Sequence, residues 1–337
     1  MTTPTGAPGR GPAAGDRADR DPAAGGSADR DPAAGDPGGS PMSTGPAGGP
    51  GLVGGGTPDL DPAYVGDVVR RALAEDLAGG EDVTSAATVP ADQVATGDLV
   101  ARADGVVAGL PVARTVFATV DPGVRWEARA QDGDHVRRGD VLATVTGPTR
   151  SLLTAERTAL NLLCHLSGVA TATAQWVAAV EGTGARIRDT RKTTPGLRAL
   201  EKYAVRQGGG VNHRMSLSDA ALVKDNHVIA AGGVATAFAL VRATYPDLPV
   251  EVECDSVADV REAVAAGADL ILLDNMSPAE MTEAVALAAP TARTEASGGL
   301  TLDTAAAVAR TGVDYISVGA LTHSARILDI ALDLREG

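Results

Sequence analysis

Hydrophobic residues follow two alternating spacings from residue 185 onward. Short apolar runs predict six strands, at Ala185–Arg188, Ala221–Val223, Val250–Glu253, Leu270–Leu273, Arg293–Glu295 and Tyr315–Val318. Between the strands, apolar residues recur every three or four positions, which predicts helices near Pro195–Arg206, Val234–Thr244, Val257–Ala265, Pro278–Ala288 and Leu302–Arg310. A repeated strand-then-helix order is typical of a parallel sheet. Because six units are fewer than those of a closed eight-stranded barrel, we expect an open, incomplete α/β barrel.

The first half of the chain has a different pattern. Helical spacing predicts a helix at Tyr64–Leu77 and one long helix or two at Leu153–Val180. Between these segments, Gly97–Val120 and Val124–Thr146 have the pattern of short strands joined by turns. The stretch Gln131–Val145 has the rhythm of a biotinyl or lipoyl carrier domain, but a carrier needs a modifiable lysine and none precedes residue 192. We therefore expect a structural α/β sandwich in this half.

These patterns divide the chain into four segments. Residues 1–58 are rich in Gly, Pro and Ala, contain no aromatic residue and predict a flexible leader. Residues 59–165 form the expected N-terminal α/β sandwich domain, and residues 166–320 form the expected barrel. For residues 321–337 we expect a C-terminal helix that packs back on the N-terminal domain.

Composition and charge narrow the function classes. No apolar run approaches the 18 or so residues of a membrane span, and the N-terminus lacks the features of a secretory signal. Cys164 and Cys254 both lie in apolar segments, so we expect buried, reduced thiols in a cytoplasmic protein. The net charge of −14 argues against nucleic acid as a partner. Between Ala185 and Arg214, however, eight basic residues stand against two acids, which favours a small polyanionic ligand.

Lysine is rare in this chain. Only Lys192, Lys202 and Lys224 occur, beside 26 arginines. Lysine is a compact charge that can titrate, whereas arginine is planar and always charged, so a site that needs lysine cannot accept the exchange. We expect Lys192 and Lys224 to be functional. For Lys202, a functional role and a chance position close to the other two lysines are equally good interpretations.

Polar or glycine residues follow every predicted strand, at the edge where the active site of a parallel barrel forms. Five residues of the basic region and the strand ends are cationic or can become so, and we expect them to meet at one mouth: Arg191, Lys192, His213, Arg214 and Lys224. Guanidinium groups match carboxylates in two-point geometry, so this set suits a dicarboxylate ligand. The alternative is a set of solvated charges on a long loop.

Two carboxylates also follow apolar runs at strand ends, Glu253 and Asp274. They can hold magnesium through water, bind sugar hydroxyls or stabilise a developing positive charge. The alternative is a buried ion pair with the lysines. The segment Glu295–Thr304 reads as strand, Ser-Gly-Gly turn and helix start, a combination that binds phosphate, and Gly319 is a candidate to complete this cradle.

Seven sequence blocks together resemble the quinolinate phosphoribosyltransferase family. They are AERTALNLLCHLSGVAT from Ala155, DTRKTTPGLRALEKYAVRQGGGVNHRM from Asp189, LVKDNH from Leu222, EVECDS from Glu251, LLDN from Leu272, EASGG from Glu295 and ISVGALTHS from Ile316. The resemblance runs in order from about Tyr64 to the C-terminus. One departure is the spacing of acids in Gly79–Ser85, so we assign no site there.

The resemblance implies a fold, an assembly and residue roles. It implies an N-terminal α/β sandwich, an open barrel and a homodimer or a multiple of dimers, in which Arg157 reaches the neighbouring site. It implies a substrate pocket made by Thr190, Arg191, Lys192, His213, Arg214 and Lys224, with Lys192, Glu253 and Asp274 as the catalytic residues. Magnesium is expected near Glu253 and Asp274, carried by the substrate without direct protein ligation. The implied phosphate cradle consists of Ser297, Gly298, Gly299, Val318, Gly319 and Ala320.

The implied reaction joins quinolinate to phosphoribosyl pyrophosphate and releases pyrophosphate and carbon dioxide. Lys224 at a barrel strand end also suits a Schiff-base aldolase, although that leaves the arginines unexplained. A non-catalytic metabolite-binding regulator of the same fold is a second alternative. A relative that acts on another pyridine is a third.

Overall fold

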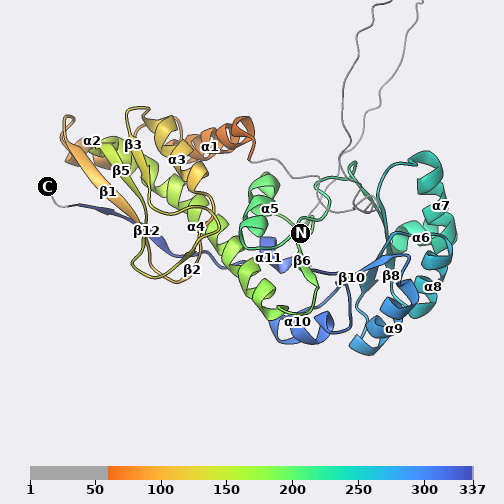
Figure 1. The fold of residues 1–337 in the computed structure, drawn as a ribbon. Coiled ribbons are helices and arrows are strands. Elements are labelled where there is room, and N and C mark those ends of the chain that lie inside the picture. Colours follow the sequence, from red (N-terminus) through yellow and green to blue (C-terminus); the bar gives the residue numbers. More distant parts are fainter. Residues whose placement is uncertain (1–59, 336–337) are drawn as a thin grey trace, which may run out of the picture. The chain divides into compact units, whose positions relative to one another are not determined.

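The structure is a computed structural model that describes residues 60–335 (Figure 1). The predicted leader, residues 1–58, lies outside the described residues. The described elements form an antiparallel sheet with its helices and a parallel sheet with its helices, and one long helix packs against both groups.

The N-terminal part is built on a four-stranded antiparallel sheet in the order β12-β1-β5-β3. Its strands are β1 (Val94–Ala101), β3 (Arg125–Ala128), β5 (Val141–Pro148) and β12 (Ile330–Leu334). Two short strands, β2 (Gly105–Val106) and β4 (His135–Val136), form a separate pair. The helices of this part are α1 (Pro62–Leu77), α2 (Val83–Thr88) and α3 (Leu110–Val120).

Helix α3 corrects the expectation of strands throughout Gly97–Val120. Its buried residues, which include Val112, Val116 and Phe117, recur at helical spacing along one face. The helix begins after Gly109, whose φ of 103° favours glycine. The distant carboxylate of Asp132 accepts the backbone N–H groups of Gly109 and Leu110 at 2.8 and 3.0 Å. A cap supplied from another segment is invisible in the local pattern, and the β-branched residues favoured strand instead.

The expected C-terminal helix is also wrong. Among the described residues, the barrel is followed by a short helix, α11 (Ala320–His323), and then by β12, which pairs antiparallel with β1. The pairing satisfies the edge of β1, and Gly97 leaves room for it, because a Cβ there would lie 2.9 Å from Leu332 Cδ1. The segment does return to the N-terminal part, but as a strand.

Helix α4 (Thr149–Ala179) is a single helix of 31 residues that runs across the predicted boundary at residue 165. It packs against α1 and α3 on the N-terminal side and against α5 (Arg198–Gln207) and α10 (Leu302–Ala309) on the other. Gly168 lies in this helix where a Cβ would approach Arg326 O to 2.2 Å, so only glycine lets the C-terminal segment cross here.

The second sheet is parallel and has six strands in the order β6-β11-β10-β9-β8-β7. The strands are β6 (Arg186–Arg188), β7 (Ala221–Val223), β8 (Val250–Cys254), β9 (Leu270–Asp274), β10 (Arg293–Ser297) and β11 (Tyr315–Ser317). The edge strands β6 and β7 are not paired with each other among the described residues, so the sheet is open, as the sequence predicted. Helices α6 (Asp225–Ala231), α7 (Val234–Thr244), α8 (Val257–Ala265) and α9 (Pro278–Ala288) complete this part (Figure 1).

Burial explains why these strands form. In β9 the residues from Leu270 to Leu273 are all buried, as expected for a strand covered on both faces. Cys164 and Cys254 are free and buried, and burial raises the pKa of the Cys254 thiol to about 12, so this thiol stays protonated and inert. Within residues 60–335 no single helix has the length and hydropathy to cross a membrane, although α6 and α7 pass that test together as a pair bent by 88°.

Candidate active site

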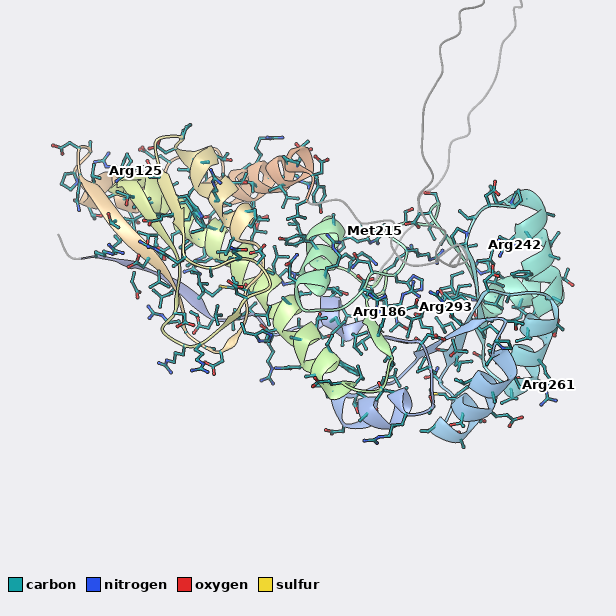
Figure 2. The ribbon with its side chains drawn as sticks, in the orientation of Figure 1. Arg125, Arg186, Met215, Arg242, Arg261 and Arg293 are labelled. Carbon is teal, nitrogen blue, oxygen red and sulfur yellow. The ribbon has the colours of Figure 1, made fainter. Side chains whose placement is uncertain are left out.

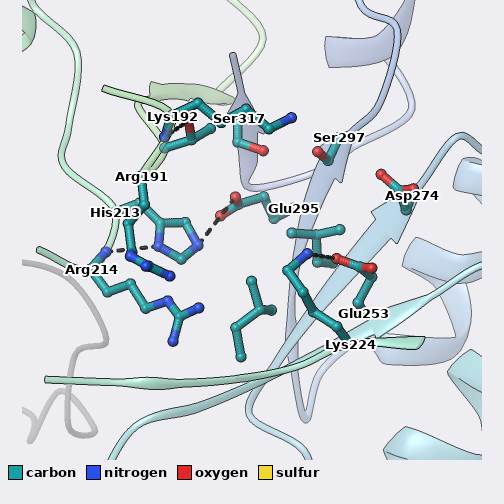
Figure 3. A pocket seen from close by; sticks show the side chains of 13 residues that line it. Arg191, Lys192, His213, Arg214, Lys224, Glu253, Asp274, Glu295, Ser297 and Ser317 are labelled. Carbon is teal, nitrogen blue, oxygen red and sulfur yellow. Dashed lines mark hydrogen bonds and ion pairs between the residues drawn. The ribbon is translucent and has the colours of Figure 1, made fainter. Parts of the chain in front are cut away.

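A pocket of about 420 Å³ opens at the carboxyl ends of the parallel strands (Figure 3). Its walls carry most of the predicted polar residues and several apolar ones: Thr190, Arg191, Lys192, His213, Arg214, Leu222, Lys224, Glu253, Leu272, Asp274, Glu295, Ser297 and Ser317. Figure 2 labels Arg186 and Arg293, which begin β6 and β10 and therefore stand at the opposite edge of the sheet. Parallel strand ends thus bring side chains from more than 100 residues of sequence to one hollow.

Two arginines line one side of the pocket. Arg191 follows β6, and Arg214 ends the glycine-rich loop that leads from α5. Arg214 donates to Ala220 O at 2.8 Å, and Arg198 ties the two segments together through Thr193 Oγ1 at 3.0 Å and Met215 O at 2.9 Å. Burial and then the nearby Arg191 lower the pKa of Arg214. Two like charges held this close favour a ligand with more than one negative charge.

The imidazole of His213 lies on the floor of the pocket and uses both ring nitrogens within the protein. Its Nδ1 accepts the Arg214 backbone N–H at 2.7 Å, so Nε2 carries the ring proton and donates to Glu251 Oε2 at 2.7 Å. Glu295 Oε1 lies 3.7 Å from the same nitrogen. Burial lowers the pKa of His213 to about 4, so the ring is neutral near pH 7. His213 therefore orients its neighbours and leaves no ring nitrogen for a ligand.

Glu251 and Glu295 are buried below this histidine. Glu295 forms an ion pair with Arg188, which stacks over the Tyr315 ring at 4.6 Å. Among the described residues, one oxygen of each carboxyl group, Oε1, has no hydrogen-bond partner. Burial raises the pKa of Glu251 to about 7, against the opposing effect of Arg188. The three ligand atoms of His213, Glu251 and Glu295 lie within 4.8 Å of one another, but the adjacent guanidinium makes the group better suited to a shared proton than to a metal.

The opposite side of the pocket carries Lys224, Glu253 and Asp274. Lys224 and Glu253 form an ion pair, in which the lysine side chain is 45% exposed. Asp274 accepts from the Asn275 side chain at 2.6 Å. The predicted alternative of an ion pair with a lysine thus exists for Glu253. The two carboxylates are partly buried, with the Glu253 side chain 11% exposed, and their oxygen atoms fit the preference of magnesium for oxygen ligands.

The Ser-Gly-Gly turn follows β10 as the sequence predicted. Ser297 lines the pocket, whereas Gly298 and Gly299 lie just behind it with φ of 90° and 57°. A Cβ on Gly298 would lie 2.3 Å from Asn275 Oδ1, so glycine is required for the close approach of β9 and β10. Helix α10 then begins at Leu302. Thr301 and Thr304 form a capping box at the N-terminus of this helix.

The remaining cradle residues flank the pocket without lining it. Val318 is buried, Gly319 precedes α11 and Ala320 begins this helix. A Cβ on Gly319 would approach the Lys192 side chain to 3.0 Å, so this glycine makes room for the lysine. Arg157 is exposed on α4 and does not line the pocket of its own chain.

Glu251 and Glu295 were not predicted as site residues, although the strand period could have identified them. Residues two apart on a strand share a face. Glu251 therefore faces the same way as Glu253, and Glu295 the same way as Ser297. Ser317 ends β11 on the same rim and was missed for the same reason.

Known proteins are similar to this chain over most of its length. A model of the quinolinate phosphoribosyl transferase C-terminal domain matches residues 169–333, and one of the N-terminal domain of the same family matches residues 82–167. The nicotinate-nucleotide pyrophosphorylase (carboxylating) of Mycobacterium leprae is 56% identical over 273 residues, which are 80% of this chain and 96% of that protein. A protein of Bacillus subtilis described as a probable enzyme of the same name is 43% identical and covers 77% of this chain and 90% of its own length.

Solved structures are similar as well. NadC from Streptococcus pyogenes superposes with a TM-score of 0.79 at 43% identity and covers 83% of this chain and all of that one. The nicotinate-nucleotide pyrophosphorylase of Francisella tularensis superposes with a TM-score of 0.80 at 37% identity, covering 82% and 98%. Both family domains occur in order, and the relatives are matched over nearly their whole length. The chain therefore belongs to the quinolinate phosphoribosyltransferase family.

Proposed function

We propose that this chain transfers the phosphoribosyl group of phosphoribosyl pyrophosphate to quinolinate, and that decarboxylation then gives nicotinate mononucleotide, pyrophosphate and carbon dioxide. The observation that carries the proposal is the pocket of about 420 Å³, which is lined by four basic side chains, Arg191, Lys192, Arg214 and Lys224, and by the carboxylates of Glu253, Asp274 and Glu295. The cations match a dicarboxylate and a pyrophosphate, while the carboxylates match a sugar cation. This reaction is a step in the formation of NAD.

The arginine side of the pocket is assigned to quinolinate. Arg191 and Arg214 present guanidinium groups that can each take one carboxylate of a planar ring in two-point geometry. Thr190 and the neutral His213 complete this side, the histidine by holding the Arg214 backbone. A rigid dianion requires donors at a set separation, which this side supplies.

The opposite side is assigned to phosphoribosyl pyrophosphate. Lys192 and Lys224 neutralise the pyrophosphate as it leaves, and Glu253 and Asp274 stabilise the positive charge that develops on the sugar carbon. Magnesium bound with the pyrophosphate, near these two carboxylates, adds charge neutralisation when present. Ser297 and the turn behind it hold the 5-phosphate. Catalysis then depends on positioning and electrostatics, without a covalent intermediate on the protein.

Decarboxylation follows from the chemistry of the new bond. Attack by the ring nitrogen makes a quaternary pyridinium, whose positive nitrogen stabilises the electron pair that stays on ring carbon 2 when carbon dioxide departs. That carbon then takes a proton. Arg191 and Arg214 hold the two carboxylates until this step. The 2-carboxylate loses its charge-assisted contact with the protein when it departs as neutral carbon dioxide.

The decisive experiment is a substrate-depletion assay with quinolinate and nicotinate in parallel, each with phosphoribosyl pyrophosphate and magnesium. Consumption of quinolinate with equal amounts of nicotinate mononucleotide and carbon dioxide is the expected result. Preference for nicotinate, or no turnover of either pyridine, would refute the proposal. Borohydride trapping with a phosphorylated aldehyde addresses the aldolase alternative, since a covalent adduct at Lys224 would support it.

We further propose a homodimer in the cytoplasm, or a multiple of dimers, in which Arg157 completes the partner's pocket. Arg157 is exposed on α4 and has no place in its own pocket. If the sites are shared, a mixture of inactive Arg157→Ala and inactive Arg191→Ala chains should recover activity, up to about a quarter of wild type by random pairing. A mixture as inactive as its components would count against sharing. The matched control is Arg70→Ala, at an exposed position of α1, which should be active by itself and give about half of wild-type activity when mixed equally with Arg191→Ala.

A further inference from the structure

Lys202 is the one lysine that the proposed function leaves unused. Its side chain, on α5, is fully buried, which is rare for lysine and requires a partner. Its Nζ forms an ion pair with Asp189, which is also fully buried, and donates to His213 O at 2.9 Å. Neither group lines the pocket. The pair therefore acts on the pocket only through what it holds.

The two partners of Lys202 belong to the two segments that carry the pocket arginines. Asp189 stands two residues before Arg191, and His213 stands immediately before Arg214. Asp189 also accepts the His213 backbone N–H at 2.8 Å. The lysine and the aspartate therefore bind the backbone C=O and N–H of the same residue, His213. A single buried ion pair thus joins the end of β6 to the loop that delivers Arg214.

Asn212 extends the clamp. Its side-chain N–H groups donate to Asp189 and to Lys202 O, the latter at 2.8 Å, and its Oδ1 accepts from Arg206 at 2.7 Å. Glycines flank this segment because α4 runs close by: a Cβ on Gly208 would approach Ala170 O to 2.3 Å. The loop is therefore set against rigid elements on both sides, and its freedom to shift is small.

We propose that the Lys202–Asp189 pair is a positioning pair that sets the separation of Arg191 and Arg214, and thereby the affinity for the two carboxylates of the pyridine substrate. The inference rests on the proposed function for the identity of that substrate. A buried ion pair is weak support for stability, because desolvation offsets the attraction, but it specifies one geometry. Lysine serves here where arginine would not, because a compact ammonium fits between one carboxylate and one carbonyl.

The test compares quinolinate with phosphoribosyl pyrophosphate. Lys202→Met alone leaves the Asp189 charge buried without its partner and is expected to unfold, so the main variant is Lys202→Met with Asp189→Asn, which removes both charges and keeps an acceptor for the His213 N–H. We expect about a tenfold or larger rise in the KM and Kd for quinolinate, with the Kd for phosphoribosyl pyrophosphate and the saturated kcat changed by no more than about threefold.

Controls separate positioning from general loss of stability. Leu163→Ala removes a fully buried side chain of α4, distant in sequence from both segments, and should lower the melting temperature without changing either affinity. Asn212→Ser weakens the clamp without removing a charge and should raise the quinolinate KM by about threefold, which keeps the test available if the double variant does not fold.

The outcomes are distinct. An unchanged quinolinate affinity in the folded double variant, or in Asn212→Ser if only that variant folds, overturns the inference, and so does an equal loss of affinity for both substrates. Wild-type turnover is measured first, so failure of the proposed function appears as absence of quinolinate consumption by wild type. Failure of the positioning inference appears instead as an active wild type with unaltered affinities in the variants.

Discussion

The two sides of the pocket are built differently. On the side of Arg191 and Arg214, the charged groups of the supporting network are buried and paired below the surface, by Lys202 with Asp189 and by Arg188 with Glu295. On the other side, the charged groups pair with each other, and the pair reaches solvent through its lysine. Lys224 and Glu253 form their own ion pair, and the lysine side chain is 45% exposed.

This difference teaches how one pocket can serve two unlike ligands. Buried pairs cannot exchange partners cheaply, so the arginine side is preorganised for a rigid planar dianion. In the Lys224–Glu253 pair the lysine side chain is 45% exposed and the glutamate side chain 11%, so under the proposed function Lys224 is the partner that can turn to a pyrophosphate at low cost. Affinity is expected to depend on the first side, and turnover on the second.

The largest effect is expected from a substitution on the side of Arg191 and Arg214. Arg191→Ala should weaken quinolinate binding by about 10²–10³-fold, because a charge-assisted two-point contact is lost, while the Kd for phosphoribosyl pyrophosphate changes little. Isothermal titration with each substrate measures both. The matched control is Arg186→Ala, an exposed arginine at the other end of the same strand, which should leave both affinities unchanged (Figure 2). Equal loss of both ligands in Arg191→Ala would contradict the division of the pocket.

The next largest effect is expected from a substitution on the side of Lys224, Glu253 and Asp274. Asp274→Asn should lower kcat by about 10²-fold with quinolinate affinity retained, because a carboxylate that faces the developing sugar cation is lost. Steady-state kinetics with separate titration of each substrate provides the measurement. Asp269→Asn is the control, since Asp269 precedes the same strand and pairs with Arg242 at the surface. A fall in quinolinate affinity without a fall in kcat would reverse the assignment.

The smallest effect concerns the buried carboxylates. Folding raises the pKa of Glu251 from 4.5 to about 7, so its contribution to stability is complete below pH 4.5 and is lost as the pH rises through about 7. His213 has the opposite sign: its pKa falls from 6.5 to about 4, so its contribution is present above pH 6.5 and is lost as the pH falls. Glu251→Gln removes only the first contribution.

Urea unfolding of wild type and Glu251→Gln at pH 5.5 and pH 8.5 separates the contribution of Glu251 to stability from that of His213. The variant should gain stability relative to wild type between these pH values, by at most about 3 kcal/mol. Glu283→Gln, at an exposed position on α9, should show no such change. A difference between wild type and Glu251→Gln that does not vary with pH would show that Glu251 does not titrate in this range.

Much of the architecture was predictable because the barrel half repeats a simple pattern. All six parallel strands appear within a few residues of their predicted ranges. The clearest case is β9, where a strand buried on both faces is a continuous apolar run from Leu270 to Leu273. The pocket followed from the same pattern, because parallel strands end at one edge and the polar residues after them must meet there. The roles of those residues in the reaction stay predictions for the experiments above.

The N-terminal half was harder for a physical reason. Its helix α3 begins with a cap from Asp132, and its fourth strand, β12, is supplied from the far end of the chain. Neither contact leaves a signal in the nearby sequence. An apolar segment rich in β-branched residues is locally compatible with helix and strand, and the partner decides between them.

By itself, the sequence determined the order of strands and helices in the barrel half, the net negative charge with its basic island, and which charged groups stand at strand ends. Only the tertiary structure decided which of those groups are buried with partners and which remain free to exchange them. Lys202 and Lys192 are the same residue type in the sequence. In the structure, Lys202 is buried in an ion pair with Asp189, whereas Lys192 lines the pocket. The reason is that burial and pairing depend on neighbours brought together by the fold, and the energy of a charge depends on that environment more than on the residue that carries it.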